Sequence, residues 1–265
     1  MPKLIVSGRG GSGKSTVTTL LAKRLAAEAA VLVVDADESN LGLPAMLGLD
    51  PPPVTVMEHL GGRSAVREQL MAALRSGGGE RVPFFADGVA LSDLPRDCTT
   101  VVGDVTLVRV GKIEHSLQGC ACPEGAVARA FVNRLSHDDR WVVVDTEAGV
   151  EHFGRGLLEG ADLVLVVADA SHEAVLLAER AAALADEAGK PCGVVLSQVD
   201  EETATILRAE LEERGARILG SVPHSSSLAR AHLLGEPLSP DGVGPALDAL
   251  AAAVVETLSE SPAHS

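Results

Sequence analysis

The sequence predicts one α/β domain, a single doubly wound, mostly parallel sheet with helices on both faces. Short runs rich in Val, Leu and Ile alternate along the chain with Ala- and Leu-rich stretches that have helical spacing. Most of the short runs are apolar on successive residues, which is typical of strands covered on both faces. A chain that alternates strand and helix forms right-handed crossovers, and these produce a parallel sheet.

Seven runs are expected to form strands: Leu4–Val6, Val31–Val34, Val105–Val110, Trp141–Val144, Leu163–Ala168, Gly193–Leu196 and Ile218–Val222. The helices expected between and after them are Ser15–Ala29, Ala126–Leu135, Ala174–Ala188, Thr203–Arg214 and Pro245–Thr257. In a sheet of this kind, functional side chains gather in the loops at the carboxyl ends of the strands.

Residues 50–104 interrupt the alternation, and we expect them to form a variable insert in a domain that spans residues 1–258. Three prolines at 51–53 and three glycines at 77–79 bracket one expected helix, Val56–Ser76. The last residues, 259–265, are expected to form a disordered tail.

Composition restricts the classes of partner. The 265 residues are 46% hydrophobic, enough for a sizeable core, and their formal net charge is −15. This charge would repel the phosphates of nucleic acid, and the 22 Lys and Arg residues are scattered rather than clustered. No apolar run is long enough to suggest a membrane span, and four cysteines imply no disulfide framework. We therefore expect a soluble cytoplasmic protein that binds neither nucleic acid nor a membrane.

A glycine-rich stretch follows the first expected strand and opens the first expected helix. It reads Gly-Arg-Gly-Gly-Ser-Gly-Lys-Ser-Thr over residues 8–16. In this setting backbone N–H groups converge on phosphate oxygens, and the helix N-terminus adds partial positive charge. Lys14 is expected to reach the β- and γ-phosphates, and the Ser15 hydroxyl to bind Mg²⁺. The expected nucleotide contacts are Gly8, Gly10, Gly11, Ser12, Gly13, Lys14, Ser15 and Thr16.

Acidic residues follow two of the expected strands. Asp35 and Asp37 end the second strand, and Asp145 directly follows the run Trp141–Val144. An acid in the position of Asp145 can hold the water shell of Mg²⁺ beside a phosphate loop. The backbone of residues 147–156 could then sense the γ-phosphate and move when it leaves. An Asp at a strand end, such as Asp37, can instead cap a helix or form a turn.

The glycine-rich loop resembles the deviant phosphate loop of the MinD/ParA/nitrogenase-iron-protein class, which reads GKGGxGKT or GKGGxGKS. The resemblance implies a MinD-like P-loop ATPase that forms a homodimer around two ATP molecules. The first lysine of that motif reaches the ATP bound to the partner. Arg9 holds its position here, and its planar fork suits phosphate oxygens. The alternative is that Arg9 is a solvated loop residue.

The same resemblance places switch I at residues 35–40. There Asp37 would orient the attacking water, and Asp35 would lie near the metal. The chain is one residue shorter than the class pattern Asp-Ala-Asp-Pro-x-Ser-Asn, so Ser39 and Asn40 each lie one position earlier than in that pattern. Switch II would be residues 147–156.

Base recognition is less well defined. The strand Gly193–Leu196 leads into Ser197-Gln198-Val199, where the class usually has Asn-Lys-Val. Ser197 can make one or two hydrogen bonds but cannot copy the paired donor and acceptor of an amide. Adenine is therefore expected from the resemblance, with Ser197 as a contact.

Cys120 and Cys122 are separated by a single alanine. Two thiols this close can seldom form a disulfide, and two thiolates make half of a tetrahedral metal site. In a two-fold dimer, two such pairs could meet and bind Zn²⁺ or Ni²⁺ at the interface. Incidental loop thiols are the alternative. Cys192 is expected in the core, and the role of Cys98 stays open.

Three stretches together narrow the resemblance: CACPEGA, DTEAGVEHFGRG and GSVPHSSSLARAHLLGEPL. They resemble the CooC-type ATPases, which are nickel-insertion accessory proteins of carbon monoxide dehydrogenase. The match runs from Lys3 to about Leu238. It implies an ATP-hydrolysing metallochaperone with Mg²⁺, an interface metal and carbon monoxide dehydrogenase as client.

Two other functions stay open. One is a MinD/ParA-like switch that recruits partners without metal transfer, and the other is a nucleotide-binding scaffold with little turnover. His152, in the expected switch II, could link the nucleotide to the metal, or it could be a surface or capping histidine. His115 is not expected to be a ligand.

Overall fold

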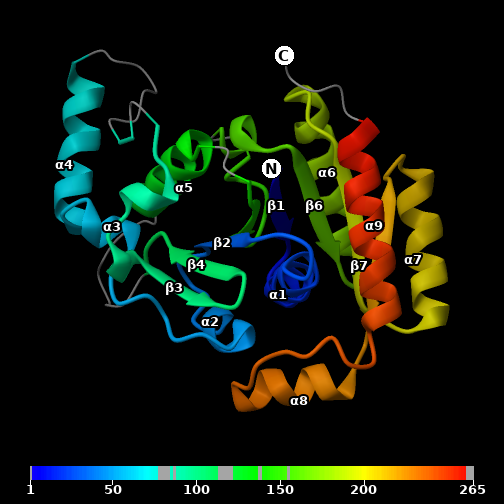
Figure 1. The fold of residues 1–265 in the computed structure, drawn as a ribbon. Helices are drawn as coiled ribbons and strands as arrows, with labels where there is room; N and C mark the ends of the chain where they lie inside the picture. Colours follow the sequence, from blue (N-terminus) through cyan, green and yellow to red (C-terminus); the bar gives the residue numbers. More distant parts are fainter. Residues whose placement is uncertain are drawn as a thin grey trace.

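The computed structural model describes residues 2–76, 84–85, 88–112, 122–136, 139–153 and 156–260. At its centre is an eight-stranded sheet in the order β3-β4-β2-β5-β1-β6-β7-β8 (Figure 1). The strands are β1 Lys3–Gly8, β2 Val31–Ala36, β3 Thr99–Val102, β4 Val105–Arg109, β5 Trp141–Thr146, β6 Leu163–Ala168, β7 Cys192–Val199 and β8 Ile218–Pro223. Neighbouring strands pair in parallel except β3 and β4, so the predicted fold class is confirmed.

Helices cover both faces of the sheet. The helices are α1 Lys14–Leu25, α2 Leu43–Leu47, α3 Val56–His59, α4 Gly62–Arg75, α5 Cys122–Arg134, α6 His172–Glu187, α7 Glu201–Glu213, α8 Ser226–Leu234 and α9 Gly244–Glu260. Side chains of α1, α2 and α9 join one buried apolar cluster, and side chains of α5, α6 and α7 join the other. Three short 3-10 helices complete the description: η1 Leu91–Asp93, η2 Arg96–Cys98 and η3 Leu157–Gly160.

The seven predicted strands are all present, and β3 is an addition to them. It pairs antiparallel with β4 through a turn at Gly103, whose φ is 54°. Only four residues long and exposed at Val101 and Val102, β3 lacks the continuous apolar run that marks the buried strands.

The prediction of one continuous helix over Val56–Ser76 is wrong, because the chain forms two helices there, α3 and α4. Gly61 and Gly62 separate them with φ values of 96° and 83°, a conformation that ends a helix and favours glycine. Thr55 begins α3 with a capping box to Glu58. The short helices α2 and α8 were also not predicted. Within the described ranges, no helix is both long and apolar enough to cross a membrane.

Candidate nucleotide-binding site

The phosphate loop joins β1 to α1 at the carboxyl edge of the sheet. A Cβ at Gly8 would lie 2.5 Å from the carbonyl oxygen of Val167 on β6, and one at Gly13 would lie 2.6 Å from Ser197 Oγ. Gly13 also has φ 97° where it begins α1. Only glycine fits both positions, so the sequence pattern here is a requirement of close backbone packing.

Lys14 and Ser15 open α1 and face this loop. Lys14 is 7% exposed, and its Nζ donates to the carbonyl oxygen of Arg9 at 3.2 Å. Ser15 Oγ donates to Asp145 Oδ2 at 2.7 Å, and Thr18 Oγ1 donates to Asp145 Oδ1 at 3.2 Å. The Ser15 hydroxyl and the Asp145 carboxylate near the end of β5 therefore lie together, and their expected contact with Mg²⁺ stays a prediction.

Asn40 completes this cluster from the loop after β2. Its Nδ2 donates to Ser15 Oγ at 2.7 Å and to Asp145 Oδ2 at 3.2 Å. The shortened loop thus still brings the Asn40 amide to the phosphate loop. A hydroxyl and a carboxylate are ligand types that Mg²⁺ accepts, directly or through water, so Ser15 and Asp145 fit that ion, while Asn40 Nδ2 donates to both.

Asp145 is fully buried, and burial raises its pKa to about 7. The hydrogen bond from Ser15 and the charge of Lys14 oppose this rise, whereas the nearby carboxylates of Asp35 and Asp37 add to it. A bound divalent cation would favour the charged carboxylate. The cluster is therefore arranged to hold more positive charge than the chain itself supplies.

Asp37 makes a turn and also lines the nucleotide cleft. Its Oδ1 accepts hydrogen bonds from Ser39 N at 2.9 Å, from Ser39 Oγ at 2.7 Å and from Asn40 N at 3.2 Å. Asp37 therefore forms a turn, which was the alternative role considered for it, and does so through Oδ1. The side chain is 7% exposed and lies in the wall of the cleft. Its role in orienting water stays a prediction.

Asp35, expected near the metal, is instead paired with a lysine that the sequence analysis did not single out. Lys112 Nζ lies 2.8 Å from each carboxylate oxygen of Asp35, and Arg109 Nε lies 3.6 Å from Oδ2. Burial raises the pKa of Asp35, while Lys112 and Arg109 act against that rise. Lys112 also donates to the carbonyl oxygens of Asp37 and Asn40.

Arg9 is engaged within its own chain. Its Nε donates to Asp169 Oδ1 at 2.9 Å, a second guanidinium nitrogen contacts Asp169 Oδ2, and a third donates to the carbonyl oxygen of Gly10 at 3.0 Å. Asp169 directly follows β6 and accepts from Ser171 Oγ at 2.6 Å. Arg9 is therefore not simply solvated, and its predicted action on a partner requires exchange of Asp169 for phosphate.

Ser197 and Gln198, at the end of β7, lie against the phosphate loop. Ser197 is 1% exposed, and its Oγ forms no hydrogen bond with any residue that the structure describes. Gln198 has φ 60°, and its Nε2 donates to the carbonyl oxygen of Gly11 at 3.2 Å. Both residues line the cleft, so a contact between Ser197 and the nucleotide stays a prediction.

These groups surround a cleft of about 690 Å³, within the usual size range of ligand sites. Phosphate-loop residues form one wall, and Asp37, Ser39 and Asn40 form another. The remaining wall comes from the end of β8 and from α8, which lies below the sheet in Figure 1. Gly10, Gly11, Gly13, Lys14, Ser15 and Thr16 line the cleft, and their contact with a nucleotide stays a prediction.

Cys122 is exposed at the first residue of α5, whereas Cys120 and His115 lie outside the described residues. Cys98 is buried and Cys192 is half-buried, and burial raises the pKa of Cys192 to about 12, as suits a core position. In the part of the chain that the structure describes, no group of three or more His, Cys, Asp or Glu is placed to hold a metal.

The helix α5 faces two loops next to the nucleotide cleft across a small cavity: the first loop, residues 37–40 after β2, and the second loop, residues 147–153 after β5. A cavity of about 20 Å³, room for about one water, is lined by Gly125, Ala128 and Arg129 of α5. Glu38 of the first loop and Glu147 and His152 of the second close it. His152 is 8% exposed and packs edge-on against Phe153, so the surface alternative for this histidine is wrong.

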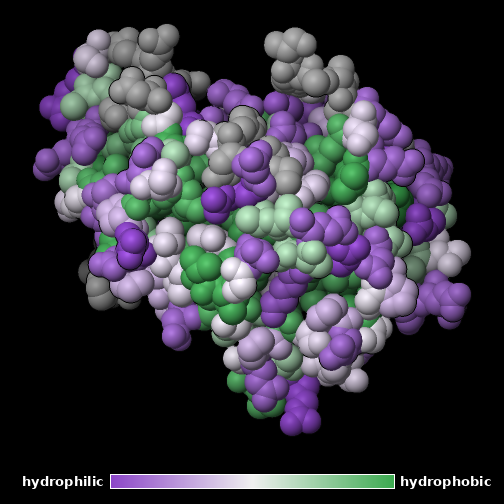
Figure 2. All heavy atoms as spheres, viewed as in Figure 1, coloured by the Kyte–Doolittle hydropathy of each residue, from purple (hydrophilic) through white to green (hydrophobic). Residues whose placement is uncertain are grey.

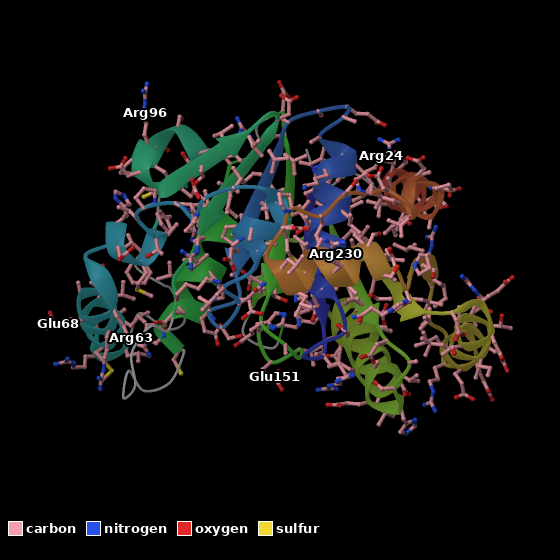
Figure 3. All side chains as sticks on the ribbon, turned by 90° about the horizontal axis from the view of Figure 1, so that it is seen from below. Arg24, Arg63, Glu68, Arg96, Glu151 and Arg230 are labelled. Atoms are coloured by element: carbon pink, nitrogen blue, oxygen red, sulfur yellow. The ribbon has the colours of Figure 1, made fainter. Side chains whose placement is uncertain are left out.

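The start of α5 is further fixed by an ion pair. Arg63 on α4, labelled in Figure 3, donates to Glu124 Oε1 at 2.5 Å. Glu124 is 4% exposed, and burial raises its pKa, with Arg63 opposing the rise. Sequence analysis missed Lys112, Asp169 and this pair. Only the position of Lys112 and Asp169 just after buried strands could have indicated them.

The comparisons agree with this geometry. The sequence profile of the CobQ/CobB/MinD/ParA nucleotide binding domain matches residues 3–238. An uncharacterized ATP-binding protein of Methanocaldococcus jannaschii is 35% identical over 239 residues, which cover 89% of this chain and 94% of that protein. The carbon monoxide dehydrogenase accessory protein CooC of Rhodospirillum rubrum is 29% identical over 242 residues, which cover 88% of each.

Among solved structures, the septum site-determining protein MinD of Pyrococcus horikoshii, complexed with Mg-ADP, gives a TM-score of 0.67 at 19% identity. The aligned region covers 97% of this chain and 96% of that chain. At this identity the likeness shows the fold alone, which is a MinD-like P-loop fold.

Proposed function

Because the chain belongs to the CobQ/CobB/MinD/ParA nucleotide-binding domain family, we propose that it is an ATPase that dimerises around its nucleotides and handles a metal ion for a client enzyme. The observation that carries the proposal is that exposed Cys122 opens α5, the helix that shares a small cavity with both loops beside the nucleotide cleft. The name of the Rhodospirillum rubrum relative supports carbon monoxide dehydrogenase as the client. Nickel is the ion that the resemblance to CooC-type ATPases implies.

The nucleotide site has the groups that ATP hydrolysis requires. Lys14 binds the β- and γ-phosphates, and Ser15 and Asp145 hold Mg²⁺, which neutralises phosphate charge when bound. Asp37 orients the water whose oxygen attacks the γ-phosphorus, while the bond from that phosphorus to the leaving ADP oxygen breaks. Adenine occupies the end of the cleft near Ser197.

Dimerisation adds Arg9 to this site. In the single chain Arg9 is held by Asp169, so its guanidinium is already a bidentate carboxylate ligand. Two oxygens of a phosphate on a nucleotide bound to the partner can accept the same pair of N–H bonds, with more negative charge. Exchange of Asp169 for phosphate would couple dimer formation to hydrolysis.

The metal site forms from the cysteine pairs of two protomers. Cys120 and Cys122 of each chain supply two thiolates, and four thiolates suit Zn²⁺ or Ni²⁺. Because α5 faces both loops beside the cleft across a small cavity, a movement of these loops on loss of the γ-phosphate would shift α5 and loosen the metal.

Phosphate release and metal content together test this proposal. The wild-type chain should release phosphate from ATP in the presence of Mg²⁺. After size-exclusion chromatography with an ATP analogue, elemental analysis should find one metal ion per dimer. The double variant Cys120→Ala with Cys122→Ala should lose the metal and keep the nucleotide, whereas the control Cys192→Ala should keep both. Equal metal content in the double variant and the control would refute the metal site.

Exposed apolar side chains near the cleft favour a second candidate, a switch that recruits a partner protein. Leu41, which directly follows the loop of residues 37–40, is 73% exposed. Leu233 and Leu234 on α8 are 82% and 54% exposed. Figure 2 shows α8 projecting from the body of the molecule with hydrophobic and hydrophilic surface side by side. A nucleotide-dependent dimer without metal would favour this candidate. Absence of phosphate release would instead indicate a binding scaffold.

A further inference from the structure

We propose that Lys112 is a positioning residue for ATP hydrolysis, which holds the main chain of Asp37 and Asn40 so that their side chains face the phosphate site. The proposal rests on the proposed ATPase function. It assigns a role to a residue that lies outside the phosphate loop and does not line the nucleotide cleft.

The contacts of Lys112 match the capacity of an ammonium group. Its side chain is 1% exposed, and an ammonium carries three N–H donors. Its acceptors are also three: the carboxylate of Asp35 and the carbonyl oxygens of Asp37 and Asn40. One side chain thus joins the end of β2 to both ends of the turn at residues 37–40.

Neutralising Asp35 does not by itself explain these contacts. Arg109 Nε already lies 3.6 Å from the Asp35 carboxylate, and a lysine that served only this acid would need no main-chain acceptors. Burying a charge is costly unless it is paired and fully hydrogen-bonded. The two carbonyl oxygens complete the pairing of Lys112, so removal of the lysine would also release the turn.

The turn in question carries the side chains that approach the phosphate site. Asn40 Nδ2 donates to Ser15 and Asp145, and Asp37 Oδ1 accepts from the amides of Ser39 and Asn40. Lys112 therefore acts through Asp37 and Asn40 without touching the nucleotide. Misplacement of groups by about an ångström can lower the rate of a reaction by about a hundredfold.

The chain supplies a matched control for this lysine. Lys3 is also buried, at 2% exposure, and its Nζ donates to the carbonyl oxygens of Val132 at 3.0 Å and Leu135 at 2.7 Å. These acceptors lie at the end of α5, away from the cleft. Lys3→Met and Lys112→Met each remove a buried ammonium and leave two carbonyl oxygens without that donor.

The test compares the two variants with the wild type at saturating ATP and Mg²⁺, with the rate expressed per bound nucleotide. Lys112→Met should lower kcat at least about tenfold and change the Kd for Mg-ADP less than about threefold, because the loop and not the binding site is disturbed. Lys3→Met should keep the wild-type kcat per bound nucleotide. Equal values of kcat in the two variants would overturn the proposal.

Two additions keep the test decisive. If Lys112→Met does not fold, Lys112→Met with Asp35→Asn removes the buried charge together with its partner, and the same loss of kcat is expected. If the wild type releases no phosphate, the proposed function fails. Hydrogen exchange of the peptide over residues 37–42 then decides the role of Lys112. Faster exchange in Lys112→Met than in Lys3→Met supports positioning, and equal exchange overturns it.

Discussion

Buried polar side chains lie at both the amino ends and the carboxyl ends of the parallel strands, but these side chains serve different purposes at the two ends. At the amino end, Lys3 donates to two carbonyl oxygens of α5, and its own amide donates to Asp162 Oδ2 at 2.7 Å. Each of these groups finds its partner within the chain, and the result is structural support for the end of a helix.

At the carboxyl end, the polar groups exceed what the chain itself uses. Asp35 and Asp145 stand opposite each other on β2 and β5, and both are fully buried. Ser12 Oγ and Ser197 Oγ are buried beside the cleft without a hydrogen bond to any part of the chain that the structure describes. Buried polar groups normally have partners, so this end is built for a ligand that supplies them. The difference teaches that buried charge supports the fold at one end of the sheet, whereas at the other end we expect it to serve a ligand.

The largest expected effect is the pH dependence of stability that Asp145 causes in the absence of Mg²⁺. Its pKa in the folded state, about 7, exceeds the ordinary value of 3.8. The folded protein therefore binds more protons than the unfolded one between about pH 4 and pH 7, and stability falls as pH rises through this window. Asp145→Asn should remove this pH dependence, which amounts to a loss of roughly 4 kcal/mol of stability across the whole window.

Urea denaturation in EDTA at pH 5 and pH 8 measures this effect. We expect the stability advantage of Asp145→Asn over the wild type to be larger at pH 8 than at pH 5, because only part of the fall has occurred at pH 5. The same difference at both pH values would mean that Asp145 does not titrate in this window.

A second expected effect concerns nucleotide affinity. Lys14→Ala should weaken binding of Mg-ATP about a hundredfold or more, since it removes the cation closest to the β- and γ-phosphates. Isothermal titration calorimetry of both proteins measures this loss. Lys23→Ala, on the same helix and away from the cleft, is the control, because Lys23 Nζ donates only to the carbonyl oxygen of Leu238 among the contacts described. Similar affinities in the two variants would argue against the predicted phosphate site.

Lys3→Met tests whether the buried charge at the amino end of the sheet has only a structural role. It should lower the free energy of unfolding by about 1–3 kcal/mol, because two buried carbonyl oxygens at the end of α5 lose their donor. Affinity for Mg-ADP should stay at the wild-type value. Urea denaturation and calorimetry on the same sample measure both quantities, and a loss of nucleotide affinity would erase the distinction between the two ends.

The smallest expected effect is that of Asp169→Asn on hydrolysis. The change weakens the hold on Arg9 within the chain and leaves the guanidinium free for a partner's nucleotide. Phosphate release per site should then reach its plateau at a lower protein concentration than in the wild type. The matched change Asp248→Asn, which removes the surface ion pair with Arg24, should leave that concentration unchanged. An identical dependence in both variants would count against action of Arg9 on the partner.

Most of the fold could be predicted because its signals are local. The buried strands are continuous apolar runs, and the phosphate loop is nine consecutive residues between a strand and a helix. The break between α3 and α4 was missed although Gly61 and Gly62 are visible in the sequence, since a glycine pair can also stand inside a helical pattern at some cost.

The remaining parts of the site depend on contacts between distant residues. Lys112 meets Asp35 across 77 positions, and Arg9 meets Asp169 across 160. No short pattern encodes such pairs. The sequence could indicate that Asp145 and Ser15 lie at the same edge of the sheet, because each follows directly from the strand or loop that carries it. The partner of Asp35 depended on how β2 and β4 lie side by side.

Native mass spectrometry tests most directly whether the carboxyl end is an ATP site that controls a metal between two protomers. The wild-type chain would be loaded with a non-hydrolysable ATP analogue or with ADP and sprayed with Ni²⁺ or Zn²⁺ at equal concentration. We predict a dimer with two nucleotides and one metal ion in the first case, and loss of that ion with ADP. A dimer that holds two nucleotides and no metal in either state would contradict the proposal.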